Sequence, residues 1–170
     1  MSQSLKFIAA AAALALAGCV SNGGEPTGGP VVPLIGTSGQ QLGTVSMWQS
    51  PGGVAFRVHA SGLSHGIHGI HVHAVGRCDA PDFTTAGAHW NPTARSHGFN
   101  NPAGHHGGDL PNVPVAANGT LNESVTLSGA SFASLIDADG AALVIHATAD
   151  DYRTDPSGNS GARIACGIFG

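Results

Sequence analysis

Histidine side chains are concentrated between residues 59 and 106, which hold all but one of the ten histidines in the chain. Residues 70–73 read Ile-His-Val-His, an alternation that is typical of a β-strand. Because residues i and i+2 of a strand point to the same side, His71 and His73 are expected on one face and the aliphatic pair on the other. Two imidazoles placed in this way can converge on one metal ion while the aliphatic face packs into a core.

A long segment without periodicity follows this strand and offers further potential ligands. Residues 76–111 are rich in glycine, proline and asparagine, and they contain His89, His97, His105, His106 and Asp109. Zinc takes nitrogen and carboxylate ligands, and imidazole also suits copper. A loop this long inside a compact domain is expected to be functional, and metal ligation would hold it in place. The alternative, histidines that face solvent, would fit a single His-x-His pair better than this cluster.

The N-terminal end is predicted to be an export signal over residues 1–18. Its apolar run, residues 7–17, is shorter than the roughly 20 residues that a membrane span needs, and it suits a signal peptide. The run ends in Leu16-Ala17-Gly18-Cys19, which resembles the lipobox of bacterial lipoproteins; an ordinary secretory signal with a chance cysteine is the alternative. The resemblance implies cleavage before Cys19 and attachment of lipid to that cysteine.

This resemblance implies a lipid-anchored protein on the periplasmic side of the bacterial cell envelope. Val20, not Asp, follows the cysteine, which favours the outer membrane over retention at the inner membrane. Residues 19–30 are rich in glycine and proline, so beyond the lipidated cysteine they are expected to form a flexible tether. The remaining residues, 31–170, are expected to form one domain of ordinary size.

An all-β domain is predicted for these residues. The chain contains 26 glycines and 10 prolines, and no long 3.6-residue apolar period follows the tether. Asn118-Gly119 predicts a type I′ hairpin turn. Eight strands with tight turns between them predict a sandwich or barrel, with strands over residues 31–36, 41–49, 54–59, 67–75, 113–117, 120–127, 141–148 and 162–169.

Charge and cysteine content restrict the function further. The formal net charge is −4, and removal of Lys6, the only lysine, would leave a mature chain one unit more negative, which argues against a nucleic-acid partner. With Cys19 assigned to the lipobox, Cys78 and Cys166 remain. Export to an oxidising compartment favours a disulfide between them over two free buried thiols.

Several motifs resemble those of the copper/zinc superoxide dismutase family, in the same order and with similar spacing. They are Gly69-Ile70-His71-Val72-His73, Ala88-His89-Trp90-Asn91-Pro92, His97-Gly98, His106-Gly107-Gly108-Asp109-Leu110, Val144-Ile145-His146-Ala147-Thr148-Ala149-Asp150-Asp151 and Gly161-Ala162-Arg163-Ile164-Ala165-Cys166-Gly167. The resemblance covers about residues 31–170. It implies an eight-stranded Greek-key β-barrel or sandwich with long metal-binding and electrostatic loops.

The resemblance implies a copper site and a zinc site that share one histidine. Copper would be bound by His71, His73, His89 and His146, and zinc by His89, His97, His106 and Asp109. The spacing to Asp109 favours His106 over His105 as the last zinc histidine. His68, which precedes the ligand strand, is expected to bond to the backbone and not to metal.

Four further positions match residues that support the metals or attract the substrate in this family. Asp150 would accept a hydrogen bond from one ligand histidine of each metal and so fix the orientation of both rings. Cys78 and Cys166 match the family's disulfide. Arg163 matches the arginine beside the copper that attracts the anionic substrate.

The activity implied by the resemblance is the disproportionation of superoxide to oxygen and hydrogen peroxide, with His89 and Arg163 in catalysis. A different class of function, a copper- or zinc-buffering envelope lipoprotein without turnover, is the alternative. All seven ligand positions and Arg163 are present, which favours the enzyme. Bacterial members of this family include monomers and dimers, so a homodimer is one of two oligomeric states to test.

Overall fold

The structure of the chain is a computed structural model that describes residues 29–170. The predicted signal peptide, Cys19 and nearly all of the predicted tether lie outside the described residues. At the start of the described part, the carbonyl of Pro30 accepts a hydrogen bond of 3.0 Å from the backbone N–H of Met47. Among the described residues, hydrogen bonding to the sheet therefore starts at Pro30.

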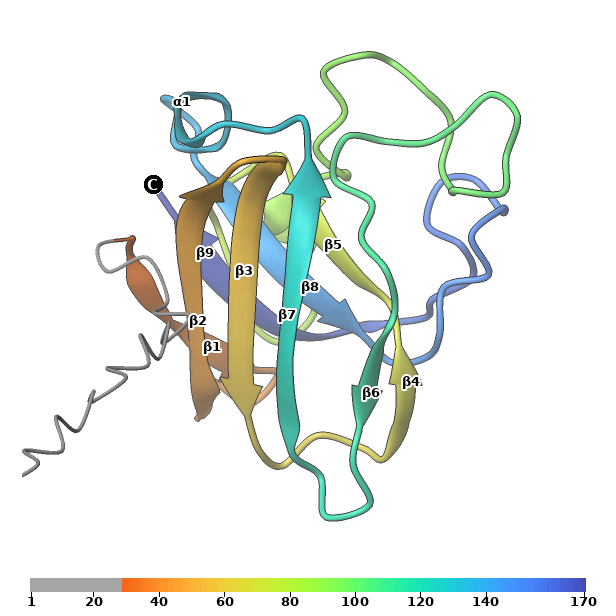
Figure 1. Cartoon of the computed structure of the whole chain (residues 1–170). Coiled ribbons are helices and arrows are strands. Elements are labelled where there is room, and N and C mark those ends of the chain that lie inside the picture. The colour runs from red at the N-terminus through yellow and green to blue at the C-terminus, as the bar shows by residue number, and fades with distance from the viewer. Residues whose placement is uncertain (1–28) are drawn as a thin grey trace, which may run out of the picture.

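The described residues form an almost entirely β structure (Figure 1). Its one short α-helix is α1, Phe132–Leu135, and η1, Thr84–Ala86, is a single 3₁₀ turn. The strands are β1 Val31–Gly36, β2 Gln41–Ser50, β3 Gly53–Ala60, β4 Gly66–His68, β5 Ile70–His73, β6 Val113–Val115, β7 Leu121–Ser128, β8 Ala141–His146 and β9 Arg163–Phe169.

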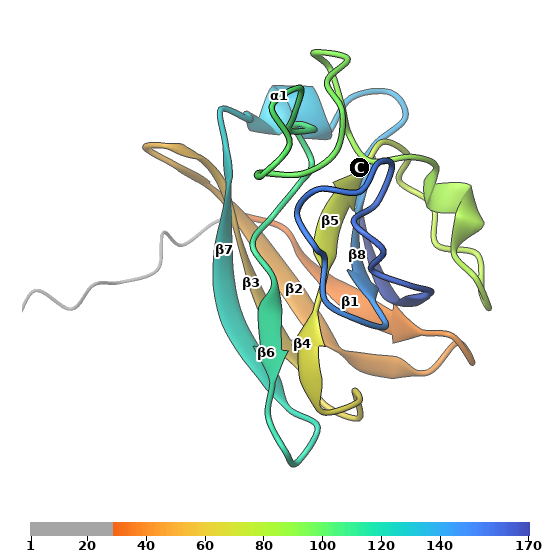
Figure 2. The same cartoon turned by 90° about the vertical axis from the view of Figure 1, so that its right-hand side faces the viewer.

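Seven of these strands form one antiparallel sheet in the order β5-β8-β9-β1-β2-β3-β7, and β4 pairs with β6 in a small second sheet. Figures 1 and 2 show that the large sheet curls, so that β8 and β9 lie behind β2 and β3. The long connections gather at one end and one side of the curled sheet. The predicted all-β class, with long loops on a barrel-like sheet, is confirmed.

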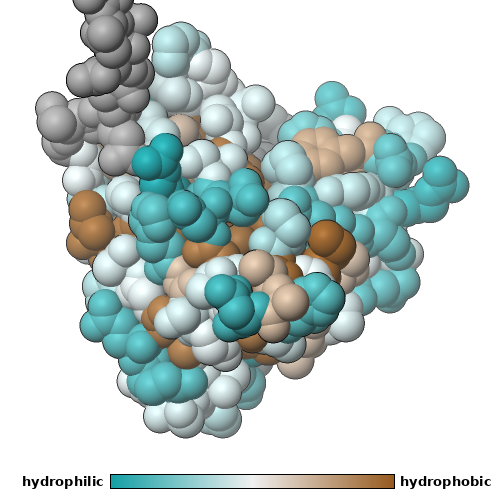
Figure 3. Space-filling model, turned by 60° about the horizontal axis from the view of Figure 1, so that its bottom comes forward, coloured by the Kyte–Doolittle hydropathy of each residue, from teal (hydrophilic) through white to brown (hydrophobic). Residues whose placement is uncertain are grey.

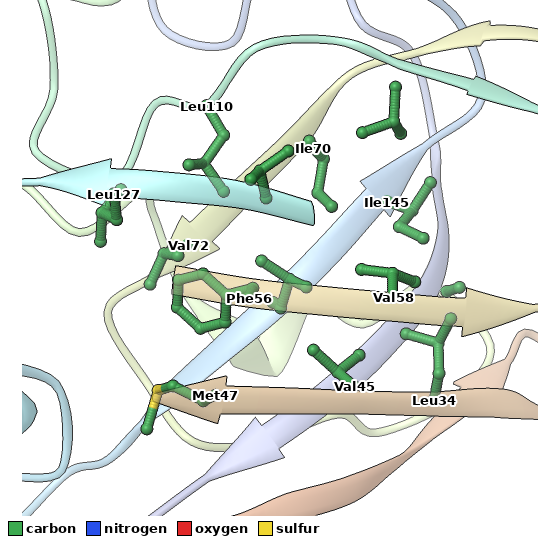
Figure 4. Packing of buried hydrophobic residues seen from close by; sticks show 14 of the residues in the cluster. Leu34, Val45, Met47, Phe56, Val58, Ile70, Val72, Leu110, Leu127 and Ile145 are labelled. Atoms are coloured by element: carbon green, nitrogen blue, oxygen red, sulfur yellow. The ribbon is translucent and has the colours of Figure 1, made fainter. Parts of the chain in front are cut away.

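The core lies between the two halves of the curled sheet. Strand β3 shows why, because Val54, Phe56 and Val58 alternate with less buried residues and are almost completely shielded from solvent. Phe56 meets Phe169 of β9 with a ring-centroid distance of 5.6 Å. Figure 4 shows the aliphatic side chains of the surrounding strands around Phe56. Burial of a side chain of this size stabilises the fold by about 1.5–3 kcal/mol.

The single strand predicted over residues 67–75 was wrong, because Gly69 divides it into β4 and β5. The Gly69 N–H donates to the Thr148 carbonyl (2.8 Å), and its carbonyl accepts from the His146 N–H (2.8 Å). A Cβ at this position would lie 2.9 Å from the Cβ of Ser160, so the close approach favours glycine. The described residues therefore form nine strands, one more than predicted.

The type I′ turn predicted at Asn118-Gly119 was also wrong. That turn needs positive φ at both residues, and only Gly119 has it, with φ 78°. The Asn118 side chain instead accepts hydrogen bonds from the N–H (3.2 Å) and hydroxyl (2.7 Å) of Thr120, an Asx turn. The preceding strand β6 ends at Val115 and pairs with β4, not with β7.

The surface of the described part carries few large apolar side chains. Figure 3 shows one face on which hydrophobic residues are scattered among polar ones. No helix within residues 29–170 is long and apolar enough to cross a membrane.

Candidate metal centre

The histidines predicted as ligands converge from one strand, one strand end and one long loop. Strand β5 presents His71 and His73, β8 ends at His146, and the loop after β5 returns across β5 through bridges of His71 with Asp109 and His73 with His89. Ile70 and Val72 of β5 point into the core, as predicted. The histidine face is buried as well, because the loop covers it.

Four imidazole nitrogens in this centre are buried and have no hydrogen-bond partner. They are His71 Nδ1, His73 Nε2, His89 Nε2 and His146 Nε2. Ligand atoms of these four residues all lie within 4.8 Å of one another. An unsatisfied buried polar atom costs about 1–3 kcal/mol, so four of them facing one point indicate a ligand that satisfies them together. We call these residues the copper group.

The second nitrogen of each ring is bonded on the opposite side, which sets the tautomer. His71 Nε2 donates to Asp150 (2.9 Å), His73 Nδ1 to the Gly87 carbonyl (2.9 Å) and His146 Nδ1 to the Gly161 carbonyl (3.2 Å). Each of these bonds leaves the lone pair of the other nitrogen directed at the centre. An all-imidazole set of this kind suits copper.

Burial keeps the rings of His71, His73 and His146 neutral at physiological pH. Desolvation lowers the pKa of His71 to about 4 and that of His146 to about 3, and it lowers the pKa of His73 well below its usual value. Neutral imidazoles can coordinate a metal ion without first losing a proton.

In a second group of four ligand atoms, three imidazole nitrogens surround one carboxylate oxygen. Asp109 Oδ1 lies 2.9 Å from His89 Nδ1, 3.0 Å from His97 Nδ1 and 3.5 Å from His106 Nδ1. His106 Nδ1 is also 3.2 Å from His89 Nδ1. Three nitrogens and one carboxylate oxygen match a tetrahedral zinc site. We call these four residues the zinc group.

His71 also lies close to His89, His97 and Asp109, but it belongs to the copper group. Its Nε2 is bonded to Asp150 and its Nδ1 is one of the four free nitrogens, so neither is left for a second ion. His106 fills the corresponding position in the zinc group.

Opposite charges hold the zinc group together in the protein without metal. Burial alone would raise the pKa of Asp109, but hydrogen bonds from His89 and His97 hold it far below its usual range. Burial alone would likewise lower the pKa of His97, but Asp109 and Asp150 raise it to about 9. His97 is therefore an imidazolium at pH 7, since both ring nitrogens donate to carboxylates.

Asp150 connects the two groups. Its Oδ2 accepts from His71 Nε2 and its Oδ1 from His97 Nε2, both at 2.9 Å. Asn112 fixes this residue in turn, because its amide donates to the Asp150 carbonyl (2.9 Å) and accepts from the Asp150 N–H (2.8 Å). Sequence reasoning did not identify Asn112, since a loop asparagine between two elements carries no periodic or ligand-type signal.

Arg163 stands at the entrance to the copper group. Its guanidinium donates to the carbonyls of Phe83 and Gly87, each at 2.7 Å. It lines a pocket of about 580 Å³ together with His73, His89 and His146. The Gly87 carbonyl also accepts from His73 Nδ1, so one backbone oxygen positions both the cation and a copper-group ring.

The predicted disulfide between Cys78 and Cys166 is confirmed. It joins the loop that carries Phe83 and Gly87 to strand β9, which carries Arg163. Cys166 packs with Phe83 and Ala86 in a small buried cluster.

The remaining histidines lie apart from both groups. His68 bonds to two backbone carbonyls, those of His146 (2.7 Å) and Ser64 (2.9 Å), which agrees with the predicted structural role. His59 and His65 are exposed. His105 bonds to the His106 carbonyl and packs on Phe99, so its ring turns away from the zinc group.

Comparisons with known proteins agree with this geometry. The family model of copper/zinc superoxide dismutase matches residues 41–169. The superoxide dismutase-like protein YojM of Bacillus subtilis is 42% identical over 145 residues, 81% of this chain and 74% of that protein. The copper-zinc superoxide dismutase of Caulobacter vibrioides is 41% identical over 138 residues, 77% of this chain and 79% of that protein.

Solved structures show the same relationship. A superoxide dismutase-like protein from Bacillus subtilis, solved as a double mutant, aligns with a TM-score of 0.79 and 42% identity over 82% of this chain and 95% of that one. The Cu/Zn superoxide dismutase from Brucella abortus aligns with a TM-score of 0.71 and 30% identity, over 84% of this chain and 100% of that one. The chain described here belongs to the copper/zinc superoxide dismutase family of oxidoreductases, which use copper and zinc.

Proposed function

We propose that this protein disproportionates superoxide at a copper ion held by His71, His73, His89 and His146. Zinc is held beside it by His89, His97, His106 and Asp109. The observation that carries this assignment is the set of four buried imidazole nitrogens without partners, all facing one point. His89 belongs to both groups, since its Nε2 is one of the free nitrogens and its Nδ1 contacts Asp109.

Copper supplies the one-electron chemistry by alternating between its two oxidation states, and zinc is redox-silent. Two superoxide anions and two protons give one oxygen molecule and one hydrogen peroxide, so the protein must deliver anions and protons. When Nε2 of His89 is not coordinating copper, it can hold one of these protons and release it to the reduced anion in the pocket. Asp109 keeps that ring oriented through its contact with Nδ1.

Arg163 binds and orients the anion. Its two backbone hydrogen bonds keep the guanidinium at the pocket wall, and its remaining N–H groups are available to the substrate. The pocket also exposes Thr84, Asn91 and Ser157 around the histidines. A single fixed cation in a partly enclosed pocket attracts small anions more strongly than the same charge on open surface.

The metal-buffering alternative is not favoured. Storage of metal ions would need only the two ligand groups. This chain also places the guanidinium of Arg163 at the mouth of the pocket beside the copper group. The direct test is superoxide-dependent reduction of cytochrome c with and without the copper- and zinc-loaded protein. Inhibition that disappears with the metals supports the dismutase, and bound metal without inhibition supports the buffer.

We further propose that the protein is anchored by lipid at Cys19 in the bacterial cell envelope, at the outer membrane and facing the periplasm. The support is the sequence Leu16-Ala17-Gly18-Cys19 followed by Val20. Mass spectrometry of the mature protein tests this, because a lipidated Cys19 as the first residue gives a distinct N-terminal fragment. Whether the chain forms a homodimer is tested separately by sedimentation of the lipid-free domain.

A further inference from the structure

Two loops meet beside the zinc group: residues 97–109 and residues 150–160 (Figures 1 and 2). Their contacts are close. The Asn100 N–H donates to the Tyr152 carbonyl at 2.8 Å, and a Cβ on Gly98 would lie only 2.2 Å from that same oxygen. Asp150 forms a further link through His97. The second loop therefore rests directly on the loop that carries the zinc group.

Asp155 makes a second carboxylate contact at this junction. Its Oδ1 accepts the backbone N–H of His97 at 2.5 Å, and the same oxygen lies 3.7 Å from Nε2 of His106. The distance to His106 is too long for a hydrogen bond, so the bond to the His97 N–H is the direct contact. The Asp155 side chain is 55% exposed, whereas the His106 side chain is 10% exposed. Asp155 thus reaches from the surface to two zinc-group residues.

The residues that follow Asp155 form part of the wall of the substrate pocket. Pro156 and Ser157 line this pocket together with His106 and Arg163. The Gly158 N–H donates to the Thr154 carbonyl at 2.6 Å, which closes the loop around them. The position of Asp155 and the position of this wall are therefore coupled through the backbone.

We propose that Asp155 is a positioning residue that ties residues 156 and 157 of the pocket wall to the zinc site. Zinc binding orders His97 and His106, and Asp155 transmits that order to the pocket entrance. This inference rests on the proposed zinc site. Its basis is the hydrogen bond to His97, for which an oxygen acceptor is needed and a full negative charge is not.

Four metal-loaded proteins test this: the wild type, Asp155→Ala, Asp155→Asn and Asp139→Ala. Asp139 is an exposed turn residue and serves as a control for the loss of one negative charge. The zinc dissociation constant is measured by competition with a chromophoric chelator. Amide hydrogen exchange of residues 154–160 is measured with and without zinc, and residues 97–109 serve as the internal reference.

Asp155→Ala is expected to weaken zinc binding about 10- to 100-fold, the range seen when a partner behind a metal ligand is lost. Zinc should no longer slow exchange in residues 154–160, although it still slows exchange in residues 97–109. Asp155→Asn should recover most of both effects, because its amide oxygen can accept the His97 N–H. Asp139→Ala should match the wild type.

Wild-type zinc affinity in Asp155→Ala would overturn the proposal, and so would an Asp155→Asn protein as weak as Asp155→Ala. Equal zinc protection of residues 154–160 in Asp155→Ala and wild type would overturn it as well. If the proposed function is wrong, the result is distinguishable from these outcomes, because the wild-type protein itself would then not bind zinc. If Asp155→Ala does not fold, Asp155→Asn still tests the proposal. The hydrogen bond is kept in this variant, so loss of the zinc protection of residues 154–160 would contradict the proposal.

Discussion

Replacement of Asp150 by asparagine tests how far the two metal groups depend on a single shared carboxylate. Asp150 Oδ2 accepts a hydrogen bond from His71 at 2.9 Å, and its Oδ1 accepts from His97 at 2.9 Å and from the Tyr152 N–H at 2.6 Å. An asparagine of the same shape keeps one acceptor oxygen. Two donors favour that oxygen at the Oδ1 position, so the NH₂ group faces the His71 N–H, one bond is lost and two donors are opposed.

The expected cost follows from this geometry. A hydrogen bond to a charged partner contributes about 1.5–3 kcal/mol, and each 1.4 kcal/mol corresponds to a tenfold change in an equilibrium constant. The loss of one bond therefore predicts metal binding that is weaker by about 10- to 100-fold, the range typical of such partners. The lost bond falls on His71 of the copper group, and zinc binding should weaken visibly as well, because Asp150 also helps to hold the charged His97 in place.

The assay is chelator competition for zinc and copper on the refolded, metal-free protein, with far-ultraviolet circular dichroism to verify the fold. Asp139→Asn is the matched control, because it removes the same charge from an exposed turn. An Asp150→Asn protein that keeps its fold and binds both metals with wild-type affinity would refute the reasoning. Weakened binding in the control as well would attribute the effect to net charge.

The remaining predictions concern the disulfide, zinc-linked protons and Arg163. Cys78→Ser should lower the melting temperature and weaken metal retention, since the closed loop, with a sequence separation of 88, contributes at most about 4–5 kcal/mol; unchanged melting and metal content under oxidising conditions would contradict this. Zinc binding at pH 7 should release about one proton, because the pKa of His97 is about 9 without metal and its Nδ1 must lose its proton to bind zinc. Calorimetry in buffers of different ionisation enthalpy measures this release, which should fade above pH 9; its absence at pH 7 would show that His97 is already neutral. Arg163→Glu should keep both metals but lower activity about tenfold or more, and added salt should slow the wild type and speed the variant; an unchanged salt response would remove Arg163 as the anion guide.

The sequence alone determined the ligand types and the strand that presents two of them. The alternation of residues 70–73 places the aliphatic pair in the core whatever loop lies on the other face, because side-chain direction in a strand has a period of two. The cysteine pair could also be inferred, since export and the count of three cysteines leave one pairing once Cys19 is set aside. These features depend on local pattern or composition.

The tertiary structure decided features that depend on distant partners. Gly69 ends one strand because Thr148 and Ser160 approach it from another part of the chain, and no periodicity in residues 67–75 records that approach. The turn at Asn118 is a local case, because the side chain of Asn118 bonds to Thr120 two residues away and forms an Asx turn in place of the predicted type I′ turn. In both cases a specific contact outweighs the conformation that the local sequence pattern favours.

The free nitrogen of each imidazole was likewise set by folding. A histidine in a sequence offers two equivalent ligand atoms, and only the partner on the opposite side selects one. That partner is 79 positions away for His71 and 14 positions away for His73. Asn112 and Asp155 act on the centre through backbone groups, which carry no residue identity. The sequence therefore determines which side chains are available, and the packing of the two loops on the sheet decides which atoms of those side chains face the metals.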